Sequence, residues 1–236
     1  MNMTTRVKAS VKHRQLRGVI FDMDGVLIDS HAAHRKAWRR FFQTLGIKIP
    51  AGELDFILDG HKRCEILKHF LGELTPTRLE ELGRRKDQIF RRVQTGIAPV
   101  PGAIAFVREL HAAGIVMAVA TSASRSRANS TLERLGLQPQ FSAVVTGEDV
   151  AVGKPDPAVY RLACAQIGLG PEYLLAIEDA VSGIRAAQGA GLRCIGIAQH
   201  KPPGKLTAAG AVQVMRNFES ISVEDLRTVL SGQGAG

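Results

Sequence analysis

The stretch Val19-Ile20-Phe21-Asp22-Met23-Asp24-Gly25 decides the fold, because an apolar segment of strand length ends abruptly at two aspartates. Gly25 allows the sharp loop that must follow, since glycine adopts backbone conformations that other residues avoid. Asp29 adds a third carboxylate with no basic residue in between. An ordinary turn after a buried strand is the simpler alternative, but such crowded negative charge requires a counterion. Hard oxygen ligands suit Mg²⁺, so the stretch predicts a magnesium site at a strand end.

Length and composition fit an intracellular globular protein. A chain of 236 residues suits one large domain or a core with a modest insertion. The cysteines, Cys64, Cys164 and Cys194, are widely separated and odd in number, which indicates reduced thiols. No apolar run approaches the roughly 18 residues of a membrane helix, and the first residues lack the apolar segment of a secretory signal. We therefore expect a cytoplasmic protein that does not enter a membrane.

The net charge of +9 raises the hypothesis of nucleic-acid binding, because clustered lysines and arginines attract phosphate backbones. Part of the excess precedes the first acidic residue, at Arg6, Lys8, Lys12, Arg14 and Arg17. The other basic residues are spread along helical stretches with few aromatics, which disfavours a nucleic-acid surface. Residues 1–16 are expected to form a disordered basic leader, with an organellar targeting segment as the alternative. A basic surface would also attract a small phosphorylated metabolite.

Two different patterns divide the chain. Helical spacing fills residues 30–97, with Ser30 as a helix N-cap, whereas short apolar strands alternate with helices from Pro101 onward. Strands are expected at residues 17–21, 115–120, 143–145, 173–177, 193–197 and 211–214. Helices are expected at residues 31–45, 53–58, 63–71, 77–94, 102–114, 125–135, 155–167 and 180–190. The alternation predicts an α/β fold with a doubly wound, Rossmann-like parallel sheet covered by helices on both faces.

Polar side chains follow four of these apolar segments. Thr121-Ser122 comes after the second expected strand, Lys154 follows the third after a loop, and Glu178-Asp179 comes after the fourth. Each motif alone is typical of a turn or a solvated cap. In parallel sheets, however, ligands bind beyond the carboxyl ends of the strands, so these groups are expected to meet Asp22 and Asp24.

The four motifs, taken in order, resemble those of the haloacid dehalogenase superfamily, whose phosphoryl-transfer members carry Asp-x-Asp-Gly-[Thr/Val] after the first core strand. Gly-Lys-Pro-x-Pro from Gly153 and Glu-Asp-x-x-x-Gly-Ile from Glu178 are similar to the β-phosphoglucomutase-like branch. The resemblance implies a core formed by residues 17–29 and 98–230, with residues 30–97 inserted as an α-helical cap. Residues 231–236 are expected to be a flexible tail, and a monomer is favoured.

The resemblance also assigns roles. Asp22 would attack phosphorus and form an aspartyl-phosphate, and Asp24 would act as general acid and base. Mg²⁺ would be held by Asp22, the backbone carbonyl of Asp24, and the carboxylates of Glu178 and Asp179. Thr121, Ser122 and Lys154 would bind the transferring phosphoryl group, and Lys154 with the metal would favour the ionised form of Asp22. A dehalogenase needs no counterpart of Asp24, so its presence favours phosphoryl transfer.

Side chains of residues 30–97 are expected to decide whether water or a sugar hydroxyl accepts the phosphoryl group. His34, followed by Ala37-Trp38, is similar to a mutase motif in which the histidine positions the acid/base aspartate; an ordinary surface histidine is the alternative. Gly60 and Arg63 lie in an expected substrate loop, and Arg63 or Lys86 would bind a distal phosphate. Asp59, immediately before Gly60, stands where β-phosphoglucomutases have a lysine. The match to the mutase motif also shifts by one residue around residues 124–127.

These departures favour a Mg²⁺-dependent phosphatase that hydrolyses a small phosphomonoester, with a sugar phosphate as the expected class. The alternative is a β-phosphoglucomutase-type enzyme, which would use the same core motifs. A non-catalytic binding protein on this fold would be expected to have lost Asp22 or Asp24, and both are present.

Overall fold

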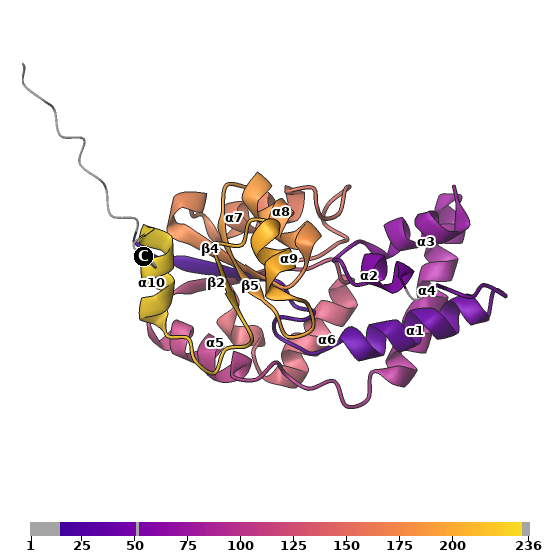
Figure 1. Cartoon of the computed structure of the whole chain (residues 1–236), viewed down its shortest axis with the longest axis horizontal. Helices are drawn as coiled ribbons and strands as arrows, with labels where there is room; N and C mark the ends of the chain where they lie inside the picture. The colour runs from indigo at the N-terminus through magenta and orange to yellow at the C-terminus, as the bar shows by residue number, and fades with distance from the viewer. Residues whose placement is uncertain (1–14, 51, 233–236) are drawn as a thin grey trace, which may run out of the picture.

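A parallel sheet of six strands, in the order β3-β2-β1-β4-β5-β6, forms the centre of the molecule (Figure 1). The computed structural model describes residues 15–50 and 52–232. Its strands are β1 (Gly18–Phe21), β2 (Val116–Ala120), β3 (Ala143–Val145), β4 (Leu174–Glu178), β5 (Arg193–Ile197) and β6 (Gln213–Met215). The chain winds outward from β1 in both directions, so a topological switch lies between β1 and β4, where such sheets bind ligands. The doubly wound α/β fold is confirmed.

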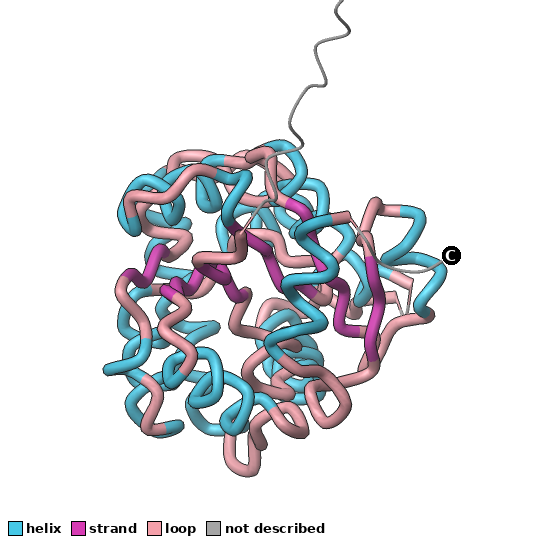
Figure 2. The backbone as a smooth tube through the Cα atoms, turned by 90° about the vertical axis from the view of Figure 1, so that its left-hand side faces the viewer, coloured by secondary structure: helices cyan, strands magenta, loops and turns pink. Residues whose placement is uncertain are grey.

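Helices cover both faces of the sheet because strand side chains point alternately to opposite sides (Figure 2). Val19 and Phe21 of β1 belong to the apolar cluster on one face, and Ile20 belongs to the cluster on the other. The first face is covered by α5 (Ala103–Ala112), α6 (Arg125–Leu135) and α10 (Val223–Ser231). The second face is covered by α7 (Ala158–Ile167), α8 (Val181–Gly189) and α9 (Pro203–Ala208). Burial on both faces explains the continuously apolar strands.

Four of the five helices described between β1 and β2 form a separate unit, which we call the helical insertion. They are α1 (His31–Gln43), α2 (Glu53–Ile57), α3 (Arg63–Leu71) and α4 (Pro76–Val93). Trp38, Phe41 and Phe42 of α1 centre an apolar cluster of their own, with Trp38 stacked on Phe42. The insertion lies beyond one end of the strands, at the right of Figure 1. This position sets it over the carboxyl ends of β1 and β2.

Most element boundaries agree with the sequence analysis to within two or three residues. The helix expected from Pro155 begins at Ala158, and the Asp156 side chain before it accepts the Ala158 N–H. Ser30 precedes α1 at the N-cap position, yet its hydroxyl donates to Asp24 and accepts no N–H from the helix. The helices α9 and α10 were not predicted.

The two expected flexible ends lie largely outside the described residues. Leu16, assigned to the leader, is 3% exposed and packs in the core. Ser231, assigned to the tail, is the last residue of α10, so the ordered chain extends further than we expected at both ends. Among the described residues, no helix combines the length and apolar character needed to cross a membrane.

Candidate active site

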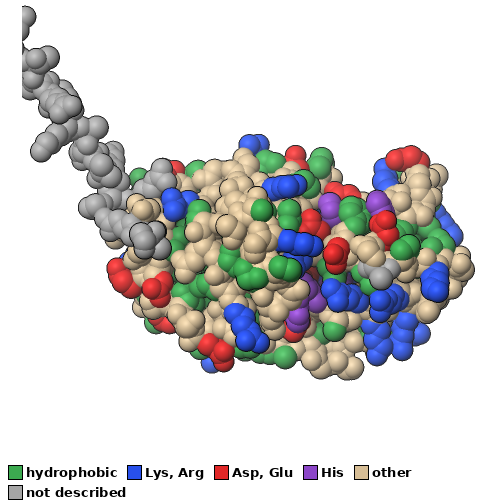
Figure 3. Space-filling view, viewed as in Figure 1, with side chains coloured by type: hydrophobic (Ala, Val, Ile, Leu, Met, Phe, Trp, Pro, Cys, Tyr) green, Lys and Arg blue, Asp and Glu red, His purple; other side chains and the backbone are tan. Residues whose placement is uncertain are grey.

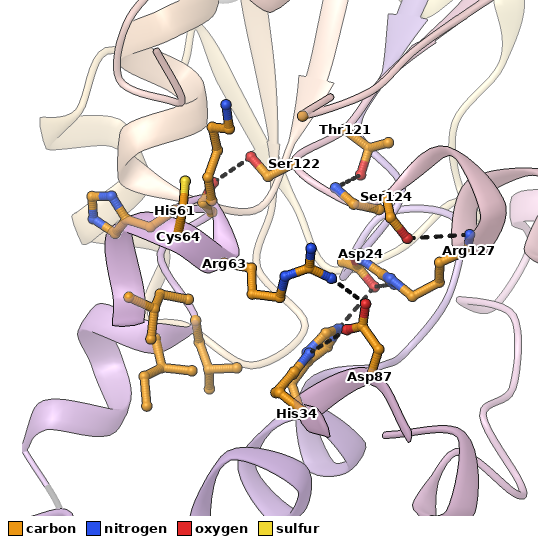
Figure 4. Close-up of a pocket in the computed structure, with 18 of the residues that line it drawn as sticks. Asp24, His34, His61, Arg63, Cys64, Asp87, Thr121, Ser122, Ser124 and Arg127 are labelled. Carbon is orange, nitrogen blue, oxygen red and sulfur yellow. Dashed lines mark hydrogen bonds and ion pairs between the residues drawn. The ribbon is translucent and has the colours of Figure 1, made fainter. Parts of the chain in front are cut away.

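One cavity of about 500 Å³ lies between the sheet and the helical insertion, and the motif residues other than Lys154 line it. Figure 4 shows Asp24, Thr121 and Ser122 among them. Asp22 and Asp24 follow β1, Thr121 and Ser122 follow β2, and Glu178 ends β4 directly before Asp179. The opposite wall comes from α1, α3 and α4. Charged and histidine side chains gather over the insertion and its junction with the core (Figure 3). The structure thus brings together groups that lie far apart in the sequence.

Lys154 links the two acidic motifs. Its Nζ donates to Asp22 Oδ1 and to Glu178 Oε1, each over 2.6 Å, and to the Ala120 carbonyl over 3.0 Å. The side chain is 1% exposed, so these contacts are shielded from solvent. Three acceptors match the three donors of an ammonium group, which fixes its position.

Burial and neighbouring charges both shift the pKa values of Asp22 and Lys154. Burial raises the pKa of Asp22 well above its ordinary value; the charge of Lys154 opposes this rise, and the charges of Glu178 and Asp179 add to it. Burial would lower the pKa of Lys154, but the charges and hydrogen bonds of Asp22 and Glu178 outweigh it and raise that pKa. Lys154 therefore stays charged, and a second cation beside Asp22 would favour its ionised form.

Glu178 is held by the protein through both carboxylate oxygens. Its Oε1 accepts from Lys154 and from the Tyr160 hydroxyl over 2.9 Å, and its Oε2 accepts from the backbone N–H groups of Asp179 and Ala180. A Cβ at Gly183 would lie 1.8 Å from Oε1, so only glycine fits there. These contacts orient Glu178 and, through it, Lys154.

Three carboxylates could hold a metal ion. Ligand oxygens of Asp22, Glu178 and Asp179 lie within 4.8 Å of one another. Oδ2 of Asp179 is 2.8 Å from His31 Nε2. A Cβ at Gly25 would lie 2.3 Å from the same Oδ2 atom. Gly25 also has a φ of +79°, which favours glycine. A compact group of hard oxygen donors suits a divalent cation such as Mg²⁺.

Asp24 turns toward α6 and the insertion. Its Oδ1 accepts from Ser30 Oγ over 2.6 Å. Arg127 contacts both oxygens, with Nη1 donating to Oδ1 over 2.8 Å and Nη2 donating to Oδ2 (Figure 4). His34 Nε2 is 3.4 Å from Oδ1. Burial would raise the pKa of Asp24, but Arg127 and His34 outweigh it and hold that pKa well below its usual value.

The hydroxyl residues after β2 have different surroundings. Thr121 is buried, and its Oγ1 accepts the Ala123 N–H over 3.2 Å. Ser122 Oγ donates to the Gly60 carbonyl over 2.6 Å and so connects the core to the insertion. Gly60 has a φ of +82°. Asp59 accepts the Val181 N–H at the start of α8 over 2.9 Å, so this departure from the mutase pattern has a structural partner.

The expected distal-phosphate residues are already in contact with other groups. Arg63 pairs with Asp87. Lys86 Nζ lies 5.0 Å from the ring centroid of Trp38 and 4.8 Å from that of Phe90, and burial lowers its pKa to about 7. His34 packs on Phe90 at 4.4 Å, and burial together with Lys86 lowers its pKa to about 4.

Sequence reasoning missed several side chains that shape this site. Arg127, Ser30, Tyr160 and His31 all contact a motif carboxylate. Arg127 lies in the first turn of the helix after Thr121, which was a usable signal. The sequence gives no signal for Tyr160, because its spacing is that of an apolar core residue in an amphipathic helix.

Comparison with known proteins identifies the family. The family model for haloacid dehalogenase-like hydrolases matches residues 16–191. The chain belongs to this family. It is accordingly an enzyme, and the resemblance drawn from the four motifs is confirmed.

Three relatives of this haloacid dehalogenase-like hydrolase align over most of their length. Protein CbbY of Cereibacter sphaeroides is 33% identical, with 87% of this chain and 94% of the relative covered. Hexitol phosphatase A of Escherichia coli is also 33% identical, over 88% and 94%. β-Phosphoglucomutase of Bacillus subtilis is 30% identical, over 89% and 93%. The crystal structure of β-phosphoglucomutase from Clostridium difficile superposes with a TM-score of 0.82 at 21% identity, over 93% and 99%, which shows the fold.

Proposed function

We propose that this hydrolase is a phosphatase that cleaves a small phosphomonoester, of the sugar phosphate class, through an aspartyl-phosphate on Asp22. The observation that carries the proposal is the contact of Lys154 with both Asp22 and Glu178 at the switch point of the sheet. This contact places the positive charge of Lys154 beside Asp22, which lines the cavity. Similarity to hexitol phosphatase A supports the same reaction class.

The reaction proceeds in two displacements. An oxygen of Asp22 attacks phosphorus, the bond from phosphorus to the leaving oxygen breaks, and that oxygen takes a proton from Asp24. Asp24 can carry this proton only once its contact with Arg127, which holds its pKa low, has broken. Water then attacks the same phosphorus, Asp24 takes a proton from the water, and the bond from phosphorus to Asp22 breaks. The products are an alcohol and inorganic phosphate, and Asp22 and Asp24 return to their starting forms.

Positioning and charge neutralisation supply most of the catalysis, since phosphoryl transfer needs little other covalent chemistry. The Thr121 hydroxyl and the Ser122 N–H bind the phosphoryl oxygens. Lys154 supplies positive charge beside them, since its three donors are taken by Asp22, Glu178 and the Ala120 carbonyl. Asp22, Asp179, Glu178 and the backbone carbonyl of Asp24 would hold Mg²⁺, which would supply positive charge to neutralise the phosphoryl group. Glu178 contributes mainly by orienting Lys154, because both of its oxygens already accept hydrogen bonds.

The helical insertion acts as the cap of the active site. It forms one wall of the cavity and contacts the core through Ser122 and Gly60. Closure over a bound substrate would exclude bulk water and bring His34, Arg63 and Lys86 toward the leaving group. Residues 30–97 are thus the cap, and the segments on either side form the catalytic core.

A second candidate is a sugar phosphate mutase, which two observations favour. The chain is similar to β-phosphoglucomutase of Bacillus subtilis. His34 also lies 3.4 Å from Asp24, as expected for a histidine that positions the acid/base group. A mutase would pass the phosphoryl group from Asp22 to a sugar hydroxyl and not to water.

One assay separates the two candidates. Phosphate release is measured with Mg²⁺ over a panel of sugar phosphates and small phosphorylated metabolites, with Asp22→Asn as the inactive control. β-Glucose 1-phosphate with a bisphosphate primer is included. The proposal expects release from a subset of the panel and none from Asp22→Asn. Conversion of glucose 1-phosphate to glucose 6-phosphate with little release would replace the phosphatase by the mutase.

A further inference from the structure

His31 is a buried histidine that the proposed reaction does not use. It is the first residue of α1 and is 6% exposed. Its Nε2 lies 2.8 Å from Oδ2 of Asp179, a buried residue of the core. A side chain of the helical insertion therefore contacts one of the three carboxylates that could hold a divalent cation.

Packing restrains the ring of His31. The ring lies against that of His200, with centroids 5.0 Å apart and an angle of 37° between the planes. His200 is itself held, because its Nε2 lies 2.7 Å from Oδ1 of Asp29. A Cβ at Gly25 would lie 2.9 Å from His31 Nε2, so the backbone after β1 also approaches this nitrogen closely. These contacts keep Nε2 beside Asp179.

The presence of a histidine at this position is hard to explain by stability alone. Among the described residues, His31 Nδ1 is buried and has no hydrogen-bond partner. A buried polar atom without a partner is unfavourable, so an apolar side chain would fill the same space at a lower cost in free energy. The contact with Asp179 is what an apolar side chain could not supply. This points to a role for His31 at Asp179.

Protein groups also occupy oxygens of the other two carboxylates. Lys154 donates to Oδ1 of Asp22, and both oxygens of Glu178 accept hydrogen bonds. With His31 beside Oδ2 of Asp179, each carboxylate has at least one oxygen in contact with the protein. Mg²⁺ binds few carboxylate oxygens and keeps several waters, whereas Ca²⁺ takes more oxygens and often both of one carboxylate. The arrangement therefore suits Mg²⁺ better than Ca²⁺.

We propose that His31 is a positioning residue that holds Oδ2 of Asp179 and leaves a single oxygen, Oδ1, for the divalent cation, which favours Mg²⁺ over Ca²⁺. The inference rests on the proposed Mg²⁺-dependent function, and it assigns part of the choice of cation to the helical insertion. His31 transfers neither a proton nor a phosphoryl group in this role. Without its contact, Asp179 could turn and offer both oxygens, an arrangement that Ca²⁺ accepts more readily than Mg²⁺.

Cation binding tests the inference without any turnover. After removal of cations with EDTA and dialysis, isothermal titration calorimetry measures the dissociation constants of Mg²⁺ and Ca²⁺ for the wild-type protein, His31→Phe and His31→Gln. Phenylalanine keeps a ring against His200 and loses the polar contact with Asp179. His31→Phe should weaken Mg²⁺ binding by about tenfold to a hundredfold, the range for a lost residue that orients a metal ligand. Ca²⁺ binding should weaken less, so the ratio of the Ca²⁺ to the Mg²⁺ dissociation constant should fall by about tenfold.

His31→Gln separates the polar contact from the packing of the ring. Its side-chain amide can donate a hydrogen bond to Asp179, so this variant should retain more of the Mg²⁺ preference than His31→Phe. His111→Gln is the matched control, because His111 is an exposed histidine of α5. Both of its dissociation constants should stay at wild-type values. Circular dichroism and urea unfolding in EDTA verify that each variant is folded.

The outcomes separate this inference from the proposed function. An equal loss of Mg²⁺ and Ca²⁺ affinity in His31→Phe would overturn the inference, since a merely structural role weakens the binding of both cations alike. Unchanged Mg²⁺ binding in folded His31→Phe would also overturn it. A wild-type protein that binds Mg²⁺ but releases phosphate from no sugar phosphate contradicts the proposed phosphatase alone. A wild-type protein that binds no Mg²⁺ contradicts the metal site and this inference with it.

Discussion

Replacing Lys86 by methionine should change how the stability of the protein depends on pH. Lys86 is 4% exposed, and its ammonium group lies over the rings of Trp38 and Phe90. Burial lowers the native pKa of Lys86 from 10.5 to about 7; Asp87 opposes this shift and Arg127 adds to it. Methionine fits an aromatic environment and carries no charge.

The sign and the size follow from proton linkage. Between pH 7 and pH 10.5 the unfolded chain keeps the Lys86 proton while the native protein has lost it. The unfolded state therefore binds more protons, and stability rises with pH in this window. For native and unfolded pKa values of about 7 and 10.5, the free energy of unfolding gains about 3 kcal/mol between about pH 7 and pH 9.5.

Urea unfolding at a series of pH values measures this contribution. The free energy of unfolding of the wild type minus that of Lys86→Met should rise by about 3 kcal/mol over the stated window. Lys36→Met is the matched control, since Lys36 is an exposed residue of α1, and its difference curve should stay flat. A flat difference curve for Lys86→Met would refute the burial of an ammonium group at this position.

Three further predictions concern the core of the site. Gly183→Ala should lower kcat about a hundredfold, because its Cβ would collide with Glu178 and displace Lys154. The control is Gly204→Ala, which lies in open space on α9 and should keep wild-type activity. Equal rates for the two variants would contradict the role of Glu178. Tyr160→Phe should lower the free energy of unfolding by about 1–3 kcal/mol, measured in urea, because a buried hydrogen bond to Glu178 is lost; an unchanged value would argue against that bond. Removal of divalent cations with EDTA should abolish phosphate release, and added Mg²⁺ should restore it; undiminished release in EDTA would exclude the proposed metal.

The sequence was sufficient to predict the architecture because strand periodicity and strand-end chemistry coincide. Apolar runs that end in Asp22, Thr121 and Glu178 required a parallel sheet with polar groups at one edge, and the sheet has that form. The helices α9 and α10 were missed for different reasons. The helix α9 has only six residues and begins at a proline. The helix α10 is as long as α3 and has a capping box at Ser222 and Asp225, which was a usable signal.

The fine structure of the site was harder to foresee, because it depends on distances between segments remote in the chain. Arg127 and Asp24 are 103 positions apart, so no local pattern relates them. Lys154 and Asp22 are 132 positions apart, and the position of each after a predicted strand was what indicated that they meet. Tyr160 illustrates a different limit: its apolar ring satisfies the helix pattern, while its hydroxyl orients Glu178.

The nucleophilic role of Asp22 is the central claim, and trapping the intermediate tests it most directly. The protein is mixed with a substrate that releases phosphate, quenched in acid during turnover, and digested for mass spectrometry. We expect one phosphoryl group on the peptide that contains Asp22, sensitive to hydroxylamine as an acyl phosphate should be, and none in Asp22→Asn. Continued phosphate release by Asp22→Asn, or a phosphoryl group trapped on another residue, would contradict the account.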